Sequence, residues 1–359
     1  MDFLKSWYQR YFSDPQVVIL ALLLVLGFAF VVVTGDILAP VLASVVIAYL
    51  LEGLVEAVER LRIPRNPSVY VVFTIFILVL IAVLFGLIPL LSRQLTQLFQ
   101  QVPGMIAQGQ SSLMMLPEKY PRVFTEQQVQ DLIAQIRDQL GDWGQAAVSW
   151  SLASVADIIT FMVYLILMPL MVFFFLKDKR EILGWFKHYV PENSGLAAKV
   201  WNDVDAQIGN YVRGKVWEIL IVWAVTFIVF TFLNLQFAML LAMLVGLSVI
   251  VPYVGATVVT IPIAIIGFYQ WGWSYDLLYL LIAYAVIQAL DGNLLVPLLF
   301  SEVVNLHPVA IIVAVLFFGG IWGLWGVFFA IPLATLVQAV LNAWPRTNGV
   351  TAKPSGAEV

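Results

Sequence analysis

Long apolar segments follow one another along most of the chain, with few charged residues inside them. A helix needs about 20 residues to cross the roughly 30 Å of hydrocarbon in a bilayer, and six segments approach that length. They lie at residues 16–34, 37–58, 68–91, 151–176, 216–235 and 275–300. The pattern predicts an all-α integral membrane protein with six full transmembrane helices.

Two further apolar segments, 237–270 and 303–343, are too long for one span and are interrupted near the middle. The interruptions are the stretch from Pro252 to Gly255 and the glycines Gly319, Gly320, Gly323 and Gly326. Halves of about 15 residues cover about 22 Å, which is short for crossing a bilayer. We therefore predict two re-entrant helical hairpins, with two pairs of short tilted spans as the alternative that gives the same sidedness.

Basic residues set the expected orientation, because cytoplasmic loops carry an excess of lysine and arginine. One basic cluster follows the second predicted span and another follows the fourth: Arg60, Arg62, Arg65, Lys177, Lys179, Arg180 and Lys187. The N- and C-termini are then cytoplasmic, and the two hairpins enter the membrane from opposite sides, the first from outside.

The same count divides the chain into six regions. They are 1–92 with the first three spans, 93–150 outside, 151–176 as the fourth span, 177–215 inside, 216–345 as a transport core with both hairpins, and 346–359 as a disordered cytoplasmic tail. Apolar residues recur at helical spacing in 125–140 and 196–208, which predicts amphipathic helices in the two extramembrane regions. Helices that lie on the membrane or pack on a neighbour are favoured over a ligand-binding domain.

Composition agrees with a membrane location, since 62% of the 359 residues are hydrophobic, 11% are charged and the mean hydropathy is +0.95. The net charge of -4 is spread along the chain, so no basic stripe indicates nucleic-acid binding. The chain has no cysteine, which excludes disulfides and thiolate nucleophiles. The first apolar run is long and lacks a small-residue cleavage site, so we interpret it as a retained anchor.

Sequence motifs for catalysis are missing. The chain has no HExxH zinc motif, no Gly-x-Ser-x-Gly elbow and no GxxxxGK[ST] phosphate loop. Asp276 and Asp291 would lie about 22 Å apart on one helix, too far for a proteolytic aspartate pair. We therefore expect no enzymatic activity and no cofactor.

Asp291 is the main candidate for a functional site. It lies in the sequence ALDGNLLVPLLF, about 22 Å along its helix from Asp276 at the outer interface, and so inside the bilayer. A carboxylate there costs about 3 kcal/mol, and no lysine or arginine occurs between Ile219 and Pro345 to pair with it. A functional carboxylate of this kind is expected to bind a solute or a coupling ion.

Several groups can solvate the Asp291 carboxylate. Its amide neighbours are Gln288 and Asn293, and Gly292 can open the helix so that backbone N–H groups become available. A water-filled cavity, a coupling cation or protonation of the acid are further ways to satisfy it. The alternative is purely structural, with Asp291 capping a helix that restarts at Leu294.

The tips of the two hairpins are the other candidates for the solute site, because non-helical backbone at membrane depth is tolerated only where it is buried or lines a cavity. The tip residues are Pro252, Gly255, Gly320, Trp322 and Gly323. An aromatic side chain at a tip can form the wall of a solute site, although packing between helices is the commoner use.

Two residues near the inner interface are secondary candidates. Glu302 falls at the inner end of the last full span, where water reaches it. His307 precedes Pro308 at the start of the second hairpin, where a structural role is favoured over a proton relay.

The C-terminal third, from DGNLLVPLLF to IPLATLVQAV, resembles the signature region of the autoinducer-2 exporter (AI-2E) family, in particular its permease-like branch. The resemblance continues upstream through VPYVGATVVTIP and through Gln207, Tyr211, Arg213 and Gly214, which adds Gln207 and Arg213 as secondary site candidates. It implies a multispanning transporter of the bacterial inner membrane with oppositely oriented hairpins. It also implies assembly as a homo-oligomer, with a pentamer as the expected stoichiometry.

The resemblance and the buried acid together indicate transport. The expected function is export of a small polar solute, similar to autoinducer-2, by an alternating-access mechanism of elevator type. A sodium or other cation/proton antiporter is one alternative. A second is a membrane scaffold or regulator that uses residues 93–150 to engage an envelope protein, although a scaffold has no need of broken helices at membrane depth.

Overall fold

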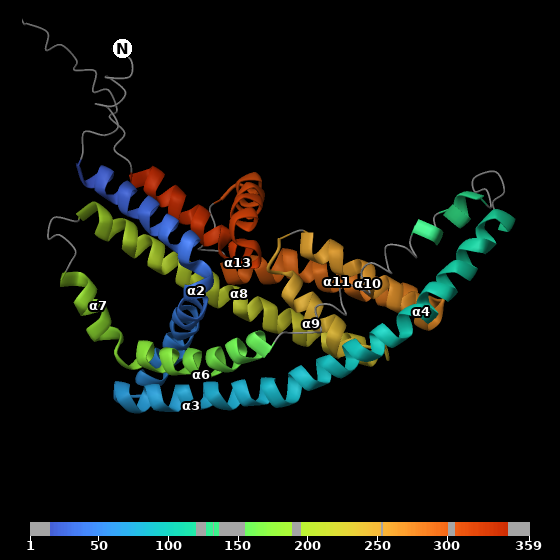
Figure 1. Cartoon of the computed structure of the whole chain (residues 1–359), viewed down its shortest axis with the longest axis horizontal. Coiled ribbons are helices and arrows are strands. Elements are labelled where there is room, and N and C mark those ends of the chain that lie inside the picture. Colours follow the sequence, from blue (N-terminus) through green and yellow to red (C-terminus); the bar gives the residue numbers. More distant parts are fainter. Residues whose placement is uncertain are drawn as a thin grey trace, which may run out of the picture. The chain divides into compact units, whose positions relative to one another are not determined.

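The computed structural model describes residues 15–119, 127–131, 133–135, 155–188, 195–252, 254–300 and 306–343 (Figure 1). Its helices are α2 (Pro15–Glu59), α3 (Arg65–Ala82), α4 (Ile88–Lys119), α6 (Val155–Lys177), α7 (Lys179–His188), α8 (Gly195–Phe232), α9 (Ala238–Ser248), α10 (Val254–Trp271), α11 (Tyr275–Leu290), α12 (Val296–Phe300) and α13 (Pro308–Ala343). Two π-helical turns, η1 (Val83–Leu87) and η2 (Asp291–Leu295), join helices end to end. No strand occurs in these residues, which confirms the predicted all-α class.

Six helical segments of the described chain are long and apolar enough to cross a membrane. They are Ile37–Glu59, Arg65–Met115, Thr160–Lys177, Gln207–Phe232, Val254–Trp271 and Tyr275–Phe300. Five overlap a predicted span, whereas Val254–Trp271 belongs to a segment that we expected to be re-entrant. The predicted spans 16–34 and 37–58 lie on one helix, because α2 continues through Gly35 and Asp36. A glycine or an aspartate inside a helix lowers its stability but does not end it.

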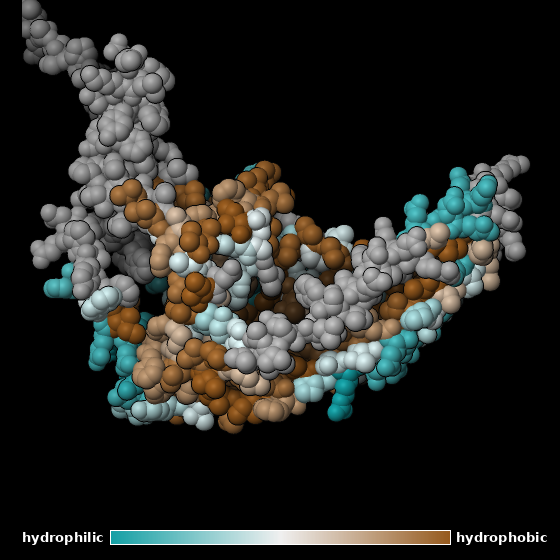
Figure 2. All heavy atoms as spheres, viewed as in Figure 1, coloured by the Kyte–Doolittle hydropathy of each residue, from teal (hydrophilic) through white to brown (hydrophobic). Residues whose placement is uncertain are grey.

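The predicted boundary between a membrane span and an outer segment at residues 92 and 93 is not a break in the helix. From Arg65, the helix runs through η1 into α4 and ends at Lys119. Figure 2 shows apolar surface over the membrane-spanning helices and hydrophilic surface toward the C-terminal end of α4. The change from an apolar to an amphipathic sequence therefore occurs within one continuous helix. Of the amphipathic helix expected at 125–140, only parts lie within the described residues.

The chain forms two compact units. One consists of Met1–Ala39, Asp178–Val212 and Glu302–Val359, and the other of Pro40–Lys177 and Arg213–Ser301. In the second unit, an apolar core is formed by buried side chains of α8 to α11 and of the turns that join α8, α9 and α10: Val222, Phe230, Leu235, Phe237, Leu240, Leu241, Val245, Val249, Val259, Ile263, Ile266, Leu280 and Tyr284. The first predicted hairpin, 237–270, contributes buried side chains to this core.

The predicted break near residues 252–255 is confirmed as a tight turn between α9 and α10, which pack against each other. The turn is close because residue 255 is a glycine: an added Cβ would overlap the carbonyl oxygen of Ser248. At about 1.5 Å per residue, the 11 residues of α9 cover about 16 Å and the 18 residues of α10 about 27 Å. Only α10 has the length of a span, and the re-entrant character of the pair stays a prediction.

Gly255→Ala is expected to destabilise the second unit by about 3 kcal/mol, since overpacking against rigid backbone is costly. Gly86→Ala is the matched control. Gly86 also lies in a helical segment, and a Cβ added there meets no atom within 4 Å. Thermal unfolding of the purified variants measures both effects. Equal stability of the two variants would show that the α9–α10 turn is looser than the structure indicates.

The second predicted break is also present, in the first unit. Gly323 has φ 57° and ψ -132°, which interrupts α13 and turns it into two apolar helices, Pro308–Gly323 and Trp325–Val340. Side chains from both halves pack together, with Ala314 and Phe318 of the first against Ala330 of the second. Because the two halves pack against each other on either side of Gly323, the chain turns back there, and we call the pair the α13 hairpin. Its re-entrant character stays a prediction.

A second apolar core in the same unit, Pro40–Lys177 with Arg213–Ser301, joins α2, α3 and α6. A charged contact accompanies it: both terminal nitrogens of Arg65 donate to the carboxylate of Glu52, at 2.9 and 3.1 Å. Arg65 also donates to the carbonyl oxygen of Leu176 at 2.9 Å. One arginine at the start of α3 therefore connects three helices.

Candidate functional site

Two charged side chains, Lys215 and Glu218, lie one turn apart on the buried face of α8, within the apolar segment Gln207–Phe232. Lys215 is 4% exposed and Glu218 is 2% exposed. The Lys215 ammonium donates a hydrogen bond to Oε2 of Glu218 at 2.7 Å. An unpaired charge at this depth costs several kcal/mol, so each residue requires the other or a substitute for it.

The Lys215 ammonium also binds the end of α9. Its Nζ donates to the carbonyl oxygen of Val249, which follows the last turn of α9, at 2.8 Å. The last carbonyl groups of a helix lack partners within the helix, and the negative end of the helix dipole stabilises a cation. The break between α9 and α10 therefore supplies one ligand of the buried lysine.

Asp291 opens the π-helical turn η2, which connects α11 to α12. Such turns are rare, and they occur frequently at functional sites. Oδ1 of Asp291 is buried and has no hydrogen-bond partner among the residues that the structure describes. Asp291 is close enough to Lys215 and Glu218 to interact electrostatically with both. We call these three residues the buried charge cluster.

Polar side chains continue from Asp291 along one face of α11. Tyr284, Gln288 and Asp291 have the spacing i, i+4, i+7, which places them on the same side of the helix. The Tyr284 hydroxyl donates to the carbonyl oxygen of Ala256 in α10 at 2.8 Å. Nε2 of Gln288 is buried without a partner in the described part of the chain. The face therefore offers one donor and one acceptor, at Gln288 and Asp291, to a ligand.

An aromatic ring covers the buried charge cluster at the end of α12. The ring centroid of Phe300 lies 5.4 Å from Nζ of Lys215, within the range of a cation–π interaction. The ring also lies against residue 214, where a Cβ would be 2.9 Å from Cε1 of Phe300. Lys215 is thus surrounded by a carboxylate, a helix-end carbonyl and an aromatic face.

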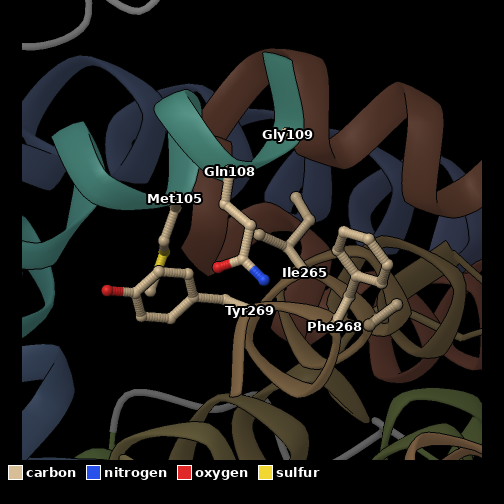
Figure 3. Close-up of a pocket in the computed structure, with 7 residues that line it drawn as sticks. Met105, Gln108, Gly109, Ile265, Phe268 and Tyr269 are labelled. Carbon is tan, nitrogen blue, oxygen red and sulfur yellow. The ribbon is translucent and has the colours of Figure 1, made fainter. Parts of the chain in front are cut away.

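A separate pocket of about 300 Å³ lies between α4 and α10 (Figure 3). Its lining residues are Met105, Gln108, Gly109, Ala264, Ile265, Phe268 and Tyr269. The side chain of Gln108 extends into the space between Tyr269 and Ile265. No lysine, arginine or carboxylate lines this pocket, so it is distinct from the buried charge cluster.

The buried charge cluster can hold one additional positive charge. With all three groups ionised, two carboxylates face one ammonium, which leaves one uncompensated negative charge. A proton, a monovalent cation or a cationic group of a solute restores neutrality. No group of three His, Cys, Asp or Glu side chains suited to a metal ion occurs in the described residues.

A sequence model of the family described as AI-2E family transporter matches residues 18–346. The chain belongs to the AI-2E transporter family. Because the described residues also contain six apolar helices of membrane-spanning length, it is a multi-pass membrane protein. The expected class, a transporter and not an enzyme, agrees with the family description.

Three relatives of this AI-2E family member indicate how far the similarity extends. PerM of Escherichia coli (strain K12), named as a candidate permease, is 42% identical over 345 residues, which cover 96% of this chain and 98% of PerM. YueF of Bacillus subtilis (strain 168), named as a candidate transport protein, is 27% identical over 319 residues, 86% of this chain and 85% of YueF. The AI-2 transport protein TqsA of Escherichia coli (strain K12) is 22% identical over 328 residues, 90% and 92% of the two chains.

The structure brings together some of the predicted site residues. Asp291 and Gln288 belong to one polar face. Pro252 and Gly255 lie in the break between α9 and α10, which also contains Val249, the residue whose carbonyl oxygen accepts from Lys215. Asn293, in contrast, is exposed, and its Nδ2 donates to the carbonyl oxygen of Ala289 on its own helix. The expectation that Asn293 is a polar partner of Asp291 is therefore wrong.

The remaining candidates lie elsewhere. Gly320, Trp322 and Gly323 lie on the α13 hairpin, where the Trp322 ring packs on Phe28 at 4.9 Å between centroids. Nδ1 of His307 accepts from the backbone N–H of Val309 at 3.2 Å, which supports a structural role at the start of α13.

The secondary candidates from the resemblance also have defined surroundings. The Arg213 guanidinium lies 6.0 Å from the ring centroid of Tyr49 and against Gly53, so it packs between α8 and α2. Gln207 is half-buried on α8. Glu302 lies outside the described residues.

The alternative that Asp291 caps a restarting helix is wrong in its geometry. No helix begins at Leu294, because η2 and α12 continue α11 through that position. The expectation that Asp291 has no basic residue nearby is also wrong, since Lys215 lies just before the stretch in which lysine and arginine are absent. Lys215 and Glu218 are therefore functional candidates that the sequence pattern alone did not single out.

Proposed function

We propose that the protein is a secondary transporter that exports a small polar solute, with a proton or monovalent cation as the coupling ion at the buried charge cluster. One observation carries the proposal: three ionisable side chains lie together inside membrane-spanning helices, beside a helix break. Such groups are costly at this depth and mark ion or substrate pathways in membrane proteins. Broken helices with free backbone groups are the usual partners of such sites in transporters.

The proposed mechanism is alternating access of elevator type. A part of the protein that carries a helix break moves relative to a fixed oligomeric frame, and the residues at each break, Gly255 and Gly323, are candidates to contact the solute. We further propose that the protein resides in the bacterial inner membrane with both termini in the cytoplasm, as a homo-oligomer and specifically a pentamer. The name of TqsA, an AI-2 transport protein, supports a small polar solute of that kind as the cargo.

A second candidate function, cation/proton antiport, is favoured by the charge count of the cluster. Two carboxylates with one ammonium can exchange a proton for an alkali metal ion without any organic solute. In that case, the unpartnered Oδ1 of Asp291 is the binding atom for both ions.

Flux through proteoliposomes tests the proposal. Purified protein is reconstituted, and efflux of labelled small polar solutes and of sodium or potassium is measured with and without a proton gradient. The transporter proposal expects solute flux above that of protein-free liposomes, with a rate that depends on the gradient. If sodium or potassium dissipates the proton gradient when no organic solute is present, the result indicates antiport. Folded, reconstituted protein that moves neither kind of species contradicts both functions and favours a scaffold.

A further inference from the structure

The buried charge cluster holds one ammonium for two carboxylates. Lys215 is bonded to Glu218 at 2.7 Å, whereas Oδ1 of Asp291 is buried without a hydrogen-bond partner among the described residues. Asp291 nevertheless lies within electrostatic range of the same lysine. Two acids therefore compete for one base, and the structure shows one of the two pairings.

The position of Lys215 suits an exchange between the two acids. Its ammonium is anchored to the carbonyl oxygen of Val249 at 2.8 Å, a contact that involves neither carboxylate. A lysine side chain has a flexible four-carbon stem and three donor hydrogens. The amine can therefore rotate from Glu218 toward Asp291 while α8 stays in place and the Val249 contact persists.

Within the described helices around Asp291, other titratable groups are few. In α9, α10 and α12 the only ionisable side chain is Tyr269, which lies near the opposite end of α10. On the helix of Asp291 itself, the titratable neighbour is Tyr284, whose hydroxyl is bonded to Ala256. The charge state of Asp291 therefore depends chiefly on Lys215 and Glu218.

We propose that Lys215 is an exchangeable internal counter-ion, which pairs with Glu218 in one state and with Asp291 in the other. The structure shows the Lys215–Glu218 pairing of the first state. In that state, Asp291 is neutralised by a small monovalent cation, either a proton or an alkali metal ion. In the second state, Lys215 displaces that cation, and Glu218 becomes the acid without a base. The exchange rests on the proposed transport function for its use, because it links cation release to a rearrangement beside the α9–α10 break.

A double-mutant cycle on the full-length protein tests the exchange without any substrate. Thermal unfolding is measured for Glu218→Gln, Asp291→Asn and the double variant. If either acid can hold Lys215, each single variant shifts the midpoint by less than about 2 °C, because the lysine keeps one partner. The double variant leaves the ammonium buried without an acid and loses about 10 °C.

The matched control combines Glu218→Gln with Asp276→Asn, the same chemical change at the exposed end of α11. It is expected to unfold at the temperature of Glu218→Gln alone. A loss of about 10 °C in Glu218→Gln alone, or failure of that variant to fold, overturns the exchange, since Asp291 then does not replace Glu218. A double variant as stable as wild type overturns it too, since Lys215 then needs neither acid.

Cation dependence of the unaltered protein gives an independent measurement. Unfolding midpoints are compared in sodium, potassium and choline chloride at equal ionic strength, and across pH at fixed salt. A midpoint that rises with an alkali ion relative to choline identifies that ion at Asp291, whereas a response to acidification alone identifies the proton.

Glu218→Gln is expected to abolish either response, because Lys215 then pairs with Asp291 in place of the cation. An unchanged response in Glu218→Gln contradicts the exchange, and so does a wild-type protein without any response. Neither result depends on whether solute flux is observed.

Discussion

Asp291→Asn is expected to reduce coupled flux by about 10- to 100-fold while the protein still folds and assembles. The reason is that a charged hydrogen-bonding partner is worth about 1.5–3 kcal/mol to a bound cation or donor, and asparagine keeps the shape of the side chain without its charge. Residual flux is expected to be independent of pH, because the titrating carboxylate is gone. The measurement is flux in proteoliposomes, with size-exclusion chromatography to confirm assembly.

Asp276→Asn serves as the control, since Asp276 lies on the same helix but is exposed, in the first turn of α11. It is expected to transport at the wild-type rate. Wild-type flux and wild-type pH dependence in Asp291→Asn would remove Asp291 from the site and leave the buried charge cluster with a structural role only.

Much of the fold follows from the sequence because the bilayer imposes simple length rules. Apolar segments of about 20 residues predicted the all-α class, and both interrupted segments are interrupted in the structure, near Gly255 and at Gly323. Helix ends were less predictable. A polar residue such as Asp36 marks a change of solvent but does not stop a helix, so α2 runs through it.

The site was predictable only in part, for a related reason. A single acid in an apolar segment is conspicuous, so Asp291 was found from its depth alone. Lys215 lies at the edge of its apolar segment, where a lysine usually reaches the interface with its long side chain. In the structure α8 begins at Gly195, so residue 215 lies well inside the helix and its ammonium binds Val249. The spacing of Lys215 and Glu218, one turn apart, was the signal that would have revealed the pair.

Local hydrogen bonding explains the fate of Asn293. Its proximity in sequence to Asp291 suggested a shared site, but a short amide on a helix can bond to the carbonyl four residues earlier. The Nδ2 atom of Asn293 makes this bond to Ala289, at 2.8 Å. Sequence neighbours on a helix share a face only at spacings of three or four residues, as Gln288 and Asp291 do.

Arg65→Met is expected to destabilise the protein by about 3–5 kcal/mol, the cost of leaving one member of a buried ion pair without its partner. Glu52 is 7% exposed, and its carboxylate receives both terminal nitrogens of Arg65. The same guanidinium holds the carbonyl oxygen of Leu176 at the end of α6. Loss of the side chain therefore removes a contact that joins α2, α3 and α6, and the thermal unfolding midpoint measures the effect.

Arg60→Met separates this structural role from the role of the basic cluster in orientation. Arg60 is exposed and belongs to the same group of arginines that predicts the cytoplasmic side, so its loss is expected to change stability by less than about 0.5 kcal/mol. The double variant Arg65→Met with Glu52→Gln is expected to recover part of the loss, because the buried acid no longer carries a charge. If Arg65→Met unfolds at the same temperature as Arg60→Met, the bidentate contact does not hold the three helices together, and the apolar core around Val55 and Val172 is sufficient by itself.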